Sequence, residues 1–359
     1  MFVSVVAKAA TDGEVVPDST MVYPDTTIVR PENVFLRTYH FVERQLFDVD
    51  SVYIQTNDHN FQTLLMNSNT YEIYRLTDND GNSIRFSPEM SMKIGPYVGY
   101  GPIFLGYTID VAHLQDRRQR EDMSLSLYSL PAGIDIYYRR SGDNFRIREL
   151  YLGDDVDASP MINQPFDGLT SKIIGANAYY IFNHRRFSYP AAFNQSTVQR
   201  QSAGSWLAGV GYTHHSLSVD WQKLNTLTQQ RLGQDVSDRF NDHELFKQIT
   251  YTDVSLSCGY GYNWVFAKNW LFASSLSLAL AYKRSVGETR RDLFAITLRD
   301  FSFENFNIDG IGRFGIVWNR GRWFAGASVI AHSYNYKKKN FYTNNSFGNL
   351  DIYAGFNFW

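Results

Sequence analysis

The sequence has little cysteine, little net charge and no long apolar run, and each of these absences excludes a class of protein. Cys258 is the single cysteine among 359 residues, so an intrachain disulfide and a CxxC metal or redox site are excluded. No segment approaches the roughly 18 consecutive apolar residues that a membrane-spanning helix needs. A net charge of -2 provides no basic surface, so we expect no nucleic-acid partner.

Aromatic side chains are abundant instead. Phe, Tyr and Trp make up 16% of the chain, with 24 Tyr and 26 Phe. In residues 254 to 264, apolar and aromatic side chains alternate with Ser, Gly and Asn, and residues 272 to 282 show a similar alternation. Successive side chains of a strand point to opposite faces, so each segment has one apolar face and one face of small groups. This pattern indicates a barrel with an apolar face toward lipid, a lumen, and aromatic girdles.

Period-two alternation bounded by turn residues predicts an all-β fold, an antiparallel transmembrane β-barrel of about 12 strands. The predicted strands span residues 60 to 76, 84 to 99, 101 to 112, 122 to 138, 143 to 152, 169 to 183, 203 to 218, 250 to 266, 269 to 284, 299 to 319, 322 to 336 and 347 to 359. Connections after odd-numbered strands, such as 219 to 249 and 337 to 346, are long or charged, whereas four of the five others, such as 139 to 142, are tight. This alternation favours short periplasmic turns and longer extracellular loops.

The ends of the chain indicate export and a location in the outer membrane of a Gram-negative bacterium. Residues 1 to 10, MFVSVVAKAA, are interpreted as the remnant of a signal peptide, because a short apolar run precedes the small-x-small pattern Ala7-Lys8-Ala9. Residues 11 to 58 are predicted to form a periplasmic N-terminal segment, and residues 59 to 359 the barrel. The aromatic C-terminal strand, IYAGFNFW, is typical of chains that the barrel-insertion machinery recognises.

Two features of the predicted barrel are irregular. Within the strand at 122 to 138 the apolar positions change parity near Leu130-Pro131, and because proline cannot donate to a strand ladder this predicts a bulge. The segment 184 to 202 is the one long connection predicted on the periplasmic side. It is either an ordinary long turn or a docking element for a periplasmic or membrane protein partner.

Charged side chains within the strands are predicted to face the lumen, because a Lys or Arg facing lipid at the bilayer midplane costs about 2 to 4 kcal/mol. Strand parity gives five lumen-facing candidates, Lys93, Asp110, Asp135, Asp309 and Arg313. They form either a salt-bridge network that rigidifies the barrel or a charged constriction that selects solutes. Outer-membrane lipid and lipopolysaccharide are expected partners, and the loop arginines Arg117, Arg118 and Arg120 are either solvated or bind lipopolysaccharide phosphate.

Sequence patterns that carry chemistry are weak. His214 and Ser216 share parity, and with Asn225 they resemble the arrangement of outer-membrane phospholipase barrels, although polar residues at a strand end explain them more simply. Gly310, Gly312 and Gly315 spell GxGxxG inside a predicted strand, so they indicate a curved sheet rather than a dinucleotide site. No His and acidic spacing suggests a metal site. We predict no catalytic residue, no metal and no cofactor.

Several long segments carry a resemblance to a known family. They are IRFSPEMSMKIGPYVGYGPIFLGYTIDV from Ile84 to Val111, SLYSLPAGIDIYYRRSG, FSYPAAFNQSTVQRQSAGSWLAG and GYGYNWVFAKNWLF. Over about residues 50 to 359 the chain resembles a family of Bacteroidota outer-membrane β-barrels known as domain of unknown function 4421. The resemblance implies a barrel in the outer membrane and no established activity. We therefore expect a non-enzymatic barrel that is a narrow, porin-like solute pore or a structural subunit of an envelope assembly. The alternative is a lipid hydrolase that uses His214 and Ser216.

Overall fold

The computed structural model describes residues 48–56, 61–89, 91–100, 103–106, 109–110, 121–141, 144–241, 248–285, 303–338 and 341–358. They belong to the second of two compact units, Glu43–Trp359. The predicted signal-peptide remnant, residues 1 to 10, and the loop arginines Arg117, Arg118 and Arg120 lie outside the described residues. Within the described ranges, no helix is long and apolar enough to cross a membrane.

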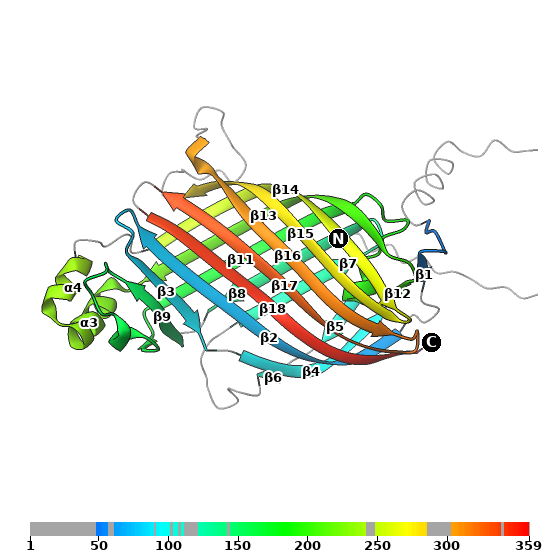
Figure 1. Cartoon of the computed structure of the whole chain (residues 1–359), viewed down its shortest axis with the longest axis horizontal. Coiled ribbons are helices and arrows are strands. Elements are labelled where there is room, and N and C mark those ends of the chain that lie inside the picture. Colours follow the sequence, from blue (N-terminus) through cyan, green and yellow to red (C-terminus); the bar gives the residue numbers. More distant parts are fainter. Residues whose placement is uncertain are drawn as a thin grey trace, which may run out of the picture. The chain divides into compact units, whose positions relative to one another are not determined.

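The strands form one large antiparallel sheet that curls on itself (Figure 1). In spatial order they are β5 (Ile103–Gly106) with β6 (Ile109–Asp110), β4 (Ser91–Tyr100), β2 (Phe61–Asp78), β18 (Phe341–Phe358), β17 (Trp323–Lys338), β16 (Phe306–Asn319), β15 (Trp270–Ser285), β14 (Gln248–Ala267), β13 (Ala203–Val219), β11 (Leu169–Ile181), β8 (Ala132–Arg140) and β7 (Glu121–Tyr128). Because β5 and β6 face β4 in one continuous register, they count as one interrupted strand, and the path has twelve strand positions. The predicted all-β antiparallel barrel fold is confirmed.

The outer and inner faces of the sheet differ as the alternation predicts. On the outside, Leu256 is 66% exposed and Leu278 is 57% exposed. Their neighbours on the inside, such as Ser255, Ser277 and Ala281, are buried. Side chains from opposite walls also meet inside the sheet, since Arg313 of β16 pairs with Asp135 of β8. The curled sheet therefore encloses a lumen whose walls are in contact.

The single strand predicted at 122 to 138 is wrong. Residues 121 to 140 form two strands, β7 and β8, which pair with each other, and Tyr128 faces Gly133. The turn between them is held by the Ser129 hydroxyl, which donates to the carbonyl oxygen of Ala132 at 2.8 Å. The change of parity at Leu130-Pro131 therefore marks a turn and not a bulge, because the chain reverses there and pairs back on itself.

The strand predicted at 143 to 152 does not span the barrel. β9 (Phe145–Tyr151) pairs with β3 (Ser83–Pro88), whereas β8 pairs directly with β11, so that Asp135 faces Asn177. As a result, the connection 139 to 142 lies at the same end of the sheet as 219 to 249, since Arg140 faces Lys172 and Leu169 faces Val219. The prediction that it lies on the opposite side of the membrane from 219 to 249 is therefore wrong. The predicted long connection 337 to 346 is also wrong, because β17 and β18 pair as far as Lys338 and Phe341.

One end of the sheet carries a small subdomain, which we call the cap. It contains β3, β9, β10 (Pro165–Phe166), the short 3-10 helix η1 (Ser159–Met161) and the helices α3 (Trp221–Leu232) and α4 (Gln234–Asn241) (Figure 1). Asp220 begins α3 by accepting a hydrogen bond from the Lys223 N–H at 3.1 Å. The fully buried side chains of Phe86, Ile147 and Met161 pack with the strand ends in one apolar cluster. The cap is therefore continuous with the barrel core.

The other end holds the segment 184–202, which we call the plug. It contains the short helix α2 (Pro190–Phe193) and β12 (Thr197–Gln199), and β12 pairs with β1 (Ile54–Thr56) of the N-terminal segment. The Tyr189 hydroxyl donates to Ser275 of β15 at 2.7 Å, and the Gln195 amide donates to the Tyr353 hydroxyl of β18 at 2.8 Å. The predicted long turn therefore folds inward and contacts several walls of the barrel.

Candidate functional site in the lumen

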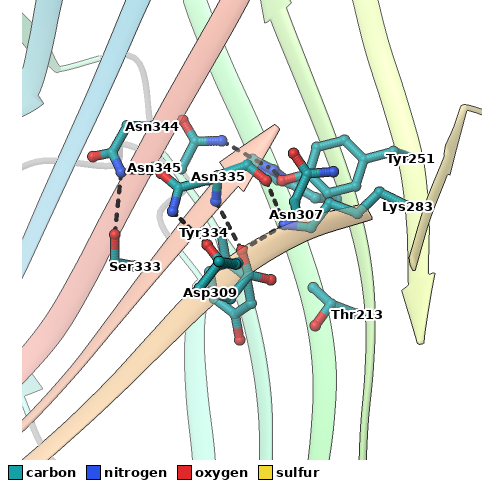
Figure 2. Close-up of polar contacts among 12 residues, drawn as sticks. Thr213, Tyr251, Lys283, Asn307, Asp309, Ser333, Tyr334, Asn335, Asn344 and Asn345 are labelled. Carbon is teal, nitrogen blue, oxygen red and sulfur yellow. Dashed lines mark hydrogen bonds and ion pairs between the residues drawn. The ribbon is translucent and has the colours of Figure 1, made fainter. Parts of the chain in front are cut away.

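The lumen is lined by buried charged side chains, and those nearest the cap surround Lys283. The Lys283 ammonium donates to Asp309 at 2.8 Å and to the carbonyl oxygen of Asn335 at 2.7 Å (Figure 2). The Asn335 N–H in turn donates to the same carboxylate at 2.9 Å. Lys283 is only 1% exposed and lies 5.4 Å from the centres of the Tyr251 and Tyr334 rings. The ammonium charge is therefore held by a carboxylate, a carbonyl and two ring faces.

A second ion pair crosses the lumen. The Arg313 guanidinium of β16 donates to the Asp135 carboxylate of β8, and it lies 4.9 Å from the centre of the Tyr179 ring. Arg313 is 2% exposed and Asp135 is 6% exposed. Since β15, β14, β13 and β11 separate the two strands along the sheet, this pair joins two distant walls.

A third ion pair joins β8, near one end of the strand order, to β2, which lies toward the other end. The Arg139 guanidinium lies 3.7 Å from the Glu72 carboxylate, and both side chains are buried. Arg139 also donates to the Asn349 side chain at 3.1 Å and stacks over the Phe347 ring at 4.8 Å. A hydrogen bond between the Tyr137 and Tyr334 hydroxyls links β8 to β17. Together these contacts connect β8 to β2, β17 and β18 across the lumen.

The five lumen-facing candidates are not one cluster. Asp309 belongs to the Lys283 group, and Asp135 and Arg313 pair with each other. Lys93 lies half-buried on β4, and Asp110 of β6 faces it in the backbone register. The Asp110 side chain lies outside the description. Sequence reasoning missed Lys283, Arg139 and Glu72. Strand alternation places Lys283 on the same inner face as Ala281, and Arg139 on the same inner face as Asp135, so both could have been predicted to face the lumen.

The residues of the hydrolase alternative are directed elsewhere. The His214 ring bonds to the Thr252 hydroxyl at 2.9 Å, and the Ser216 hydroxyl bonds to Thr250 at 3.1 Å, so each contacts a threonine of β14. The Asn225 side chain is on α3 and accepts a hydrogen bond from Ser237. A nucleophilic serine needs a histidine within hydrogen-bond reach, and neither of these bonds supplies one.

A cavity of about 200 Å³ lies inside the lumen among the described residues. Strands from different parts of the strand order line it. The lining residues include Asp135 and Tyr137 of β8, His332 of β17, and Asn194 and Gln195 of the plug. Within the described ranges, no group of three or more His, Cys, Asp or Glu is arranged to hold a metal ion. The geometry therefore offers a small, partly open space without a metal centre among those residues.

A family profile described as Domain of unknown function (DUF4421) matches residues 48–358. No curated protein matches the chain in sequence. Similar solved structures include the outer-membrane protease OmpT of Escherichia coli, with 6% identity, a TM-score of 0.32, and 84% of this chain and 98% of that chain covered.

The comparison also includes the toluene transporter TodX of P. putida, with 10% identity, a TM-score of 0.20 and coverage of 84% and 90%. The attachment invasion locus protein Ail of Yersinia pestis has 8% identity, a TM-score of 0.20 and coverage of 82% and 99%. TM-scores below 0.5 transfer neither an activity nor a site to this chain.

Proposed function

This chain belongs to the family described as Domain of unknown function (DUF4421), and we propose that it is an integral outer-membrane barrel with a closed lumen. In this proposal it is non-enzymatic and acts as a structural subunit of an envelope assembly. The ion pair between Arg313 and Asp135 carries the proposal, because it joins distant walls where an open pore would hold water.

The membrane location is supported by the outer face of the sheet. From Val254 to Trp264 every second side chain of β14 points outward, and five large ones on this face are 41 to 66% exposed. Ten residues of a strand tilted by about 40° span about 25 Å, the height of the apolar band of a transmembrane barrel. Exposed Trp206, Trp264, Trp270 and Trp323 lie toward the plug end. They match an interfacial girdle.

The closed lumen is supported by the number of contacts that opening it would break. Removing one partner of a buried ion pair leaves an uncompensated charge and costs about 3 to 5 kcal/mol, so these pairs fix which walls meet. Arg313–Asp135 and Arg139–Glu72 both join separated strands, and the plug is bonded to β14, β15 and β18. A wide aqueous path would have to break several of these contacts at once.

The cavity favours a second candidate function, a narrow solute pore. A space of about 200 Å³ between the plug and the charged walls is large enough for a small solute. Passage would require the plug to move. The lipid hydrolase alternative gains no comparable support, because His214 and Ser216 each bond to a threonine.

Single-channel recording of the purified full chain in planar bilayers separates the two candidates. The closed barrel is expected to give no stepwise conductance while the protein migrates as a heat-modifiable folded barrel on gels. Stepwise conductance of the wild-type protein would favour the pore.

For the assembly role, native electrophoresis of mildly solubilised outer membranes should show a complex larger than the isolated barrel. Migration of the protein as a lone barrel would contradict this role.

A further inference from the structure

The cavity beside the plug has the features of a small-molecule site. Its walls come from β2, β4, β7, β8, β17, β18 and the plug, so strands that are distant in sequence line it together. Its volume of about 200 Å³ equals the space of about seven waters at about 30 Å³ each. Drug-sized ligands occupy about 300 to 1,000 Å³, so the space suits one compact molecule.

Three side chains that line the cavity each have a buried polar atom without a hydrogen-bond partner. Tyr128, Asp135 and His332 are all more than nine-tenths buried. The hydroxyl of Tyr128, the Oδ1 of Asp135 and the Nδ1 of His332 each have no hydrogen-bond partner in the protein. A buried polar atom without a partner costs about 1 to 3 kcal/mol. A ligand with several groups that both donate and accept would satisfy them after small side-chain rotations.

Two ion pairs at the cavity are complete within the protein. Asp135 pairs with Arg313, and Arg139 pairs with Glu72. A charged ligand would lose its hydration and compete with the partners of these pairs, so we expect it to bind more weakly than a neutral one. The lining also includes the aromatic rings of Tyr97, Phe347 and Tyr353, which offer apolar surfaces to C–H groups.

We propose that this cavity binds one neutral polyhydroxylated molecule of monosaccharide size. Hydroxyl groups match the unpartnered atoms of Tyr128, Asp135 and His332, and the C–H face of a sugar ring matches the aromatic wall. The amides of Asn194 and Gln195 place the plug at the same site. This inference goes beyond the closed-barrel function and does not depend on it, because a barrel that conducts nothing can still hold a small molecule.

Titration calorimetry of the detergent-solubilised full chain tests the site. The probes are D-glucose, D-galactose and D-mannose, with glucosamine and glucuronate as cationic and anionic analogues of matched size. At least one neutral hexose is expected to bind saturably at millimolar concentration, and the charged analogues should bind at least about tenfold more weakly. Absence of binding by all neutral hexoses, or equal binding of the charged analogues, would overturn the proposal.

Two variants locate the binding in the cavity. Ser328→Leu fills the space from β17 and should abolish binding, whereas Ala327→Leu adds the same side chain on the outer face of that strand and should leave it unchanged. Tyr128→Phe keeps the shape of the wall, removes one hydroxyl, and should weaken binding about two- to tenfold. If Ser328→Leu does not fold, the affinity of Tyr128→Phe alone tests whether the ligand binds in the cavity. Wild-type affinity in Tyr128→Phe, or in a folded Ser328→Leu protein, would refute the site, whatever the conductance measurements show.

Discussion

At the scale of single residues, charged side chains that are buried and matched in pairs determine how the walls of the lumen meet. Arg313 is 2% exposed, and its guanidinium donates to Asp135 and lies over the face of Tyr179. Such a pair adds little net stability relative to apolar side chains of the same size, but removing one partner is costly, because the other remains buried and charged. The paired charges therefore specify which walls meet.

Arg313→Leu should expose this dependence. Asp135 would be left buried without its cation, so the free energy of unfolding should fall by about 3 to 5 kcal/mol. The double variant Arg313→Leu, Asp135→Leu should recover most of that loss, because no charge remains unpaired. Denaturant unfolding in lipid vesicles measures both, and Lys268→Leu, at an exposed turn, is the control, expected within about 0.5 kcal/mol of wild type. Equal losses in the single and double variants would contradict the ion-pair argument.

The sequence predicts the face of these residues but not their partners. Alternation placed Asp135, Asp309 and Arg313 on the inner face, and there they are buried. Arg313 and Asp135 are 178 residues apart, and their strands do not pair, so no local pattern connects them. Lys283 lies on the inner face of β15, one residue beyond the segment 272 to 282 in which the alternation is clear. Its role depends on Asp309 of the next strand, which only the register of β15 and β16 brings near.

At the scale of elements, the errors of sequence interpretation occur where the chain turns. A bulge and a tight turn both reverse the parity of apolar residues, so residues 122 to 138 carry the same pattern in either case. Whether the chain continues or folds back depends on pairing between Tyr128 and Gly133. The alternation of β9 likewise does not tell a spanning strand from a strand of the cap, since its partner is β3.

The plug is the element whose position depends on a few buried amides. The Asn263 side chain of β14 donates to the carbonyl oxygen of Ser188 at 2.8 Å and to the Gln199 side chain at 3.0 Å. Gln199 in turn accepts from the Ser188 N–H and donates to the carbonyl oxygen of Tyr53. Asn263 therefore anchors the plug to the barrel wall, and Gln199 connects it to the N-terminal segment.

Asn263→Ala should loosen the plug without unfolding the barrel. Backbone amides of residues 186 to 199 should exchange with deuterium about 10-fold faster, because losing the two hydrogen bonds costs about 1 to 3 kcal/mol locally. Amides in the middle of β14 and β15 should keep their protection. Hydrogen-exchange mass spectrometry measures this. Asn69→Ala is the control, since that amide bonds to Asn67 of the same strand. Unchanged exchange in the plug would show that its packing, and not Asn263, holds it in place.

At the scale of the whole molecule, the two faces of the sheet have exchanged the roles they play in a soluble protein. Charged side chains such as Arg313 and Asp135 are inside and paired, whereas Leu256, Leu276 and Leu278 are more than half exposed on the outside. In water such a surface would favour aggregation. In a bilayer an apolar outer face has the lowest free energy. The free-energy cost of placing a charged side chain on that face depends on its depth in the bilayer.

This dependence on depth gives a decisive test of the membrane assignment. Leu278 faces Cys258 near the middle of the apolar band, and Leu278→Arg should lower the free energy of unfolding in vesicles by about 2 to 4 kcal/mol. Val254→Arg, on the same outer face at the cap-end rim, should cost only about 0 to 1 kcal/mol. An outer face in water would give two small and similar losses, because arginine is then hydrated at both positions. A large difference between two exposed sites, 49% and 57% accessible, arises only if the solvent between the rims is hydrocarbon.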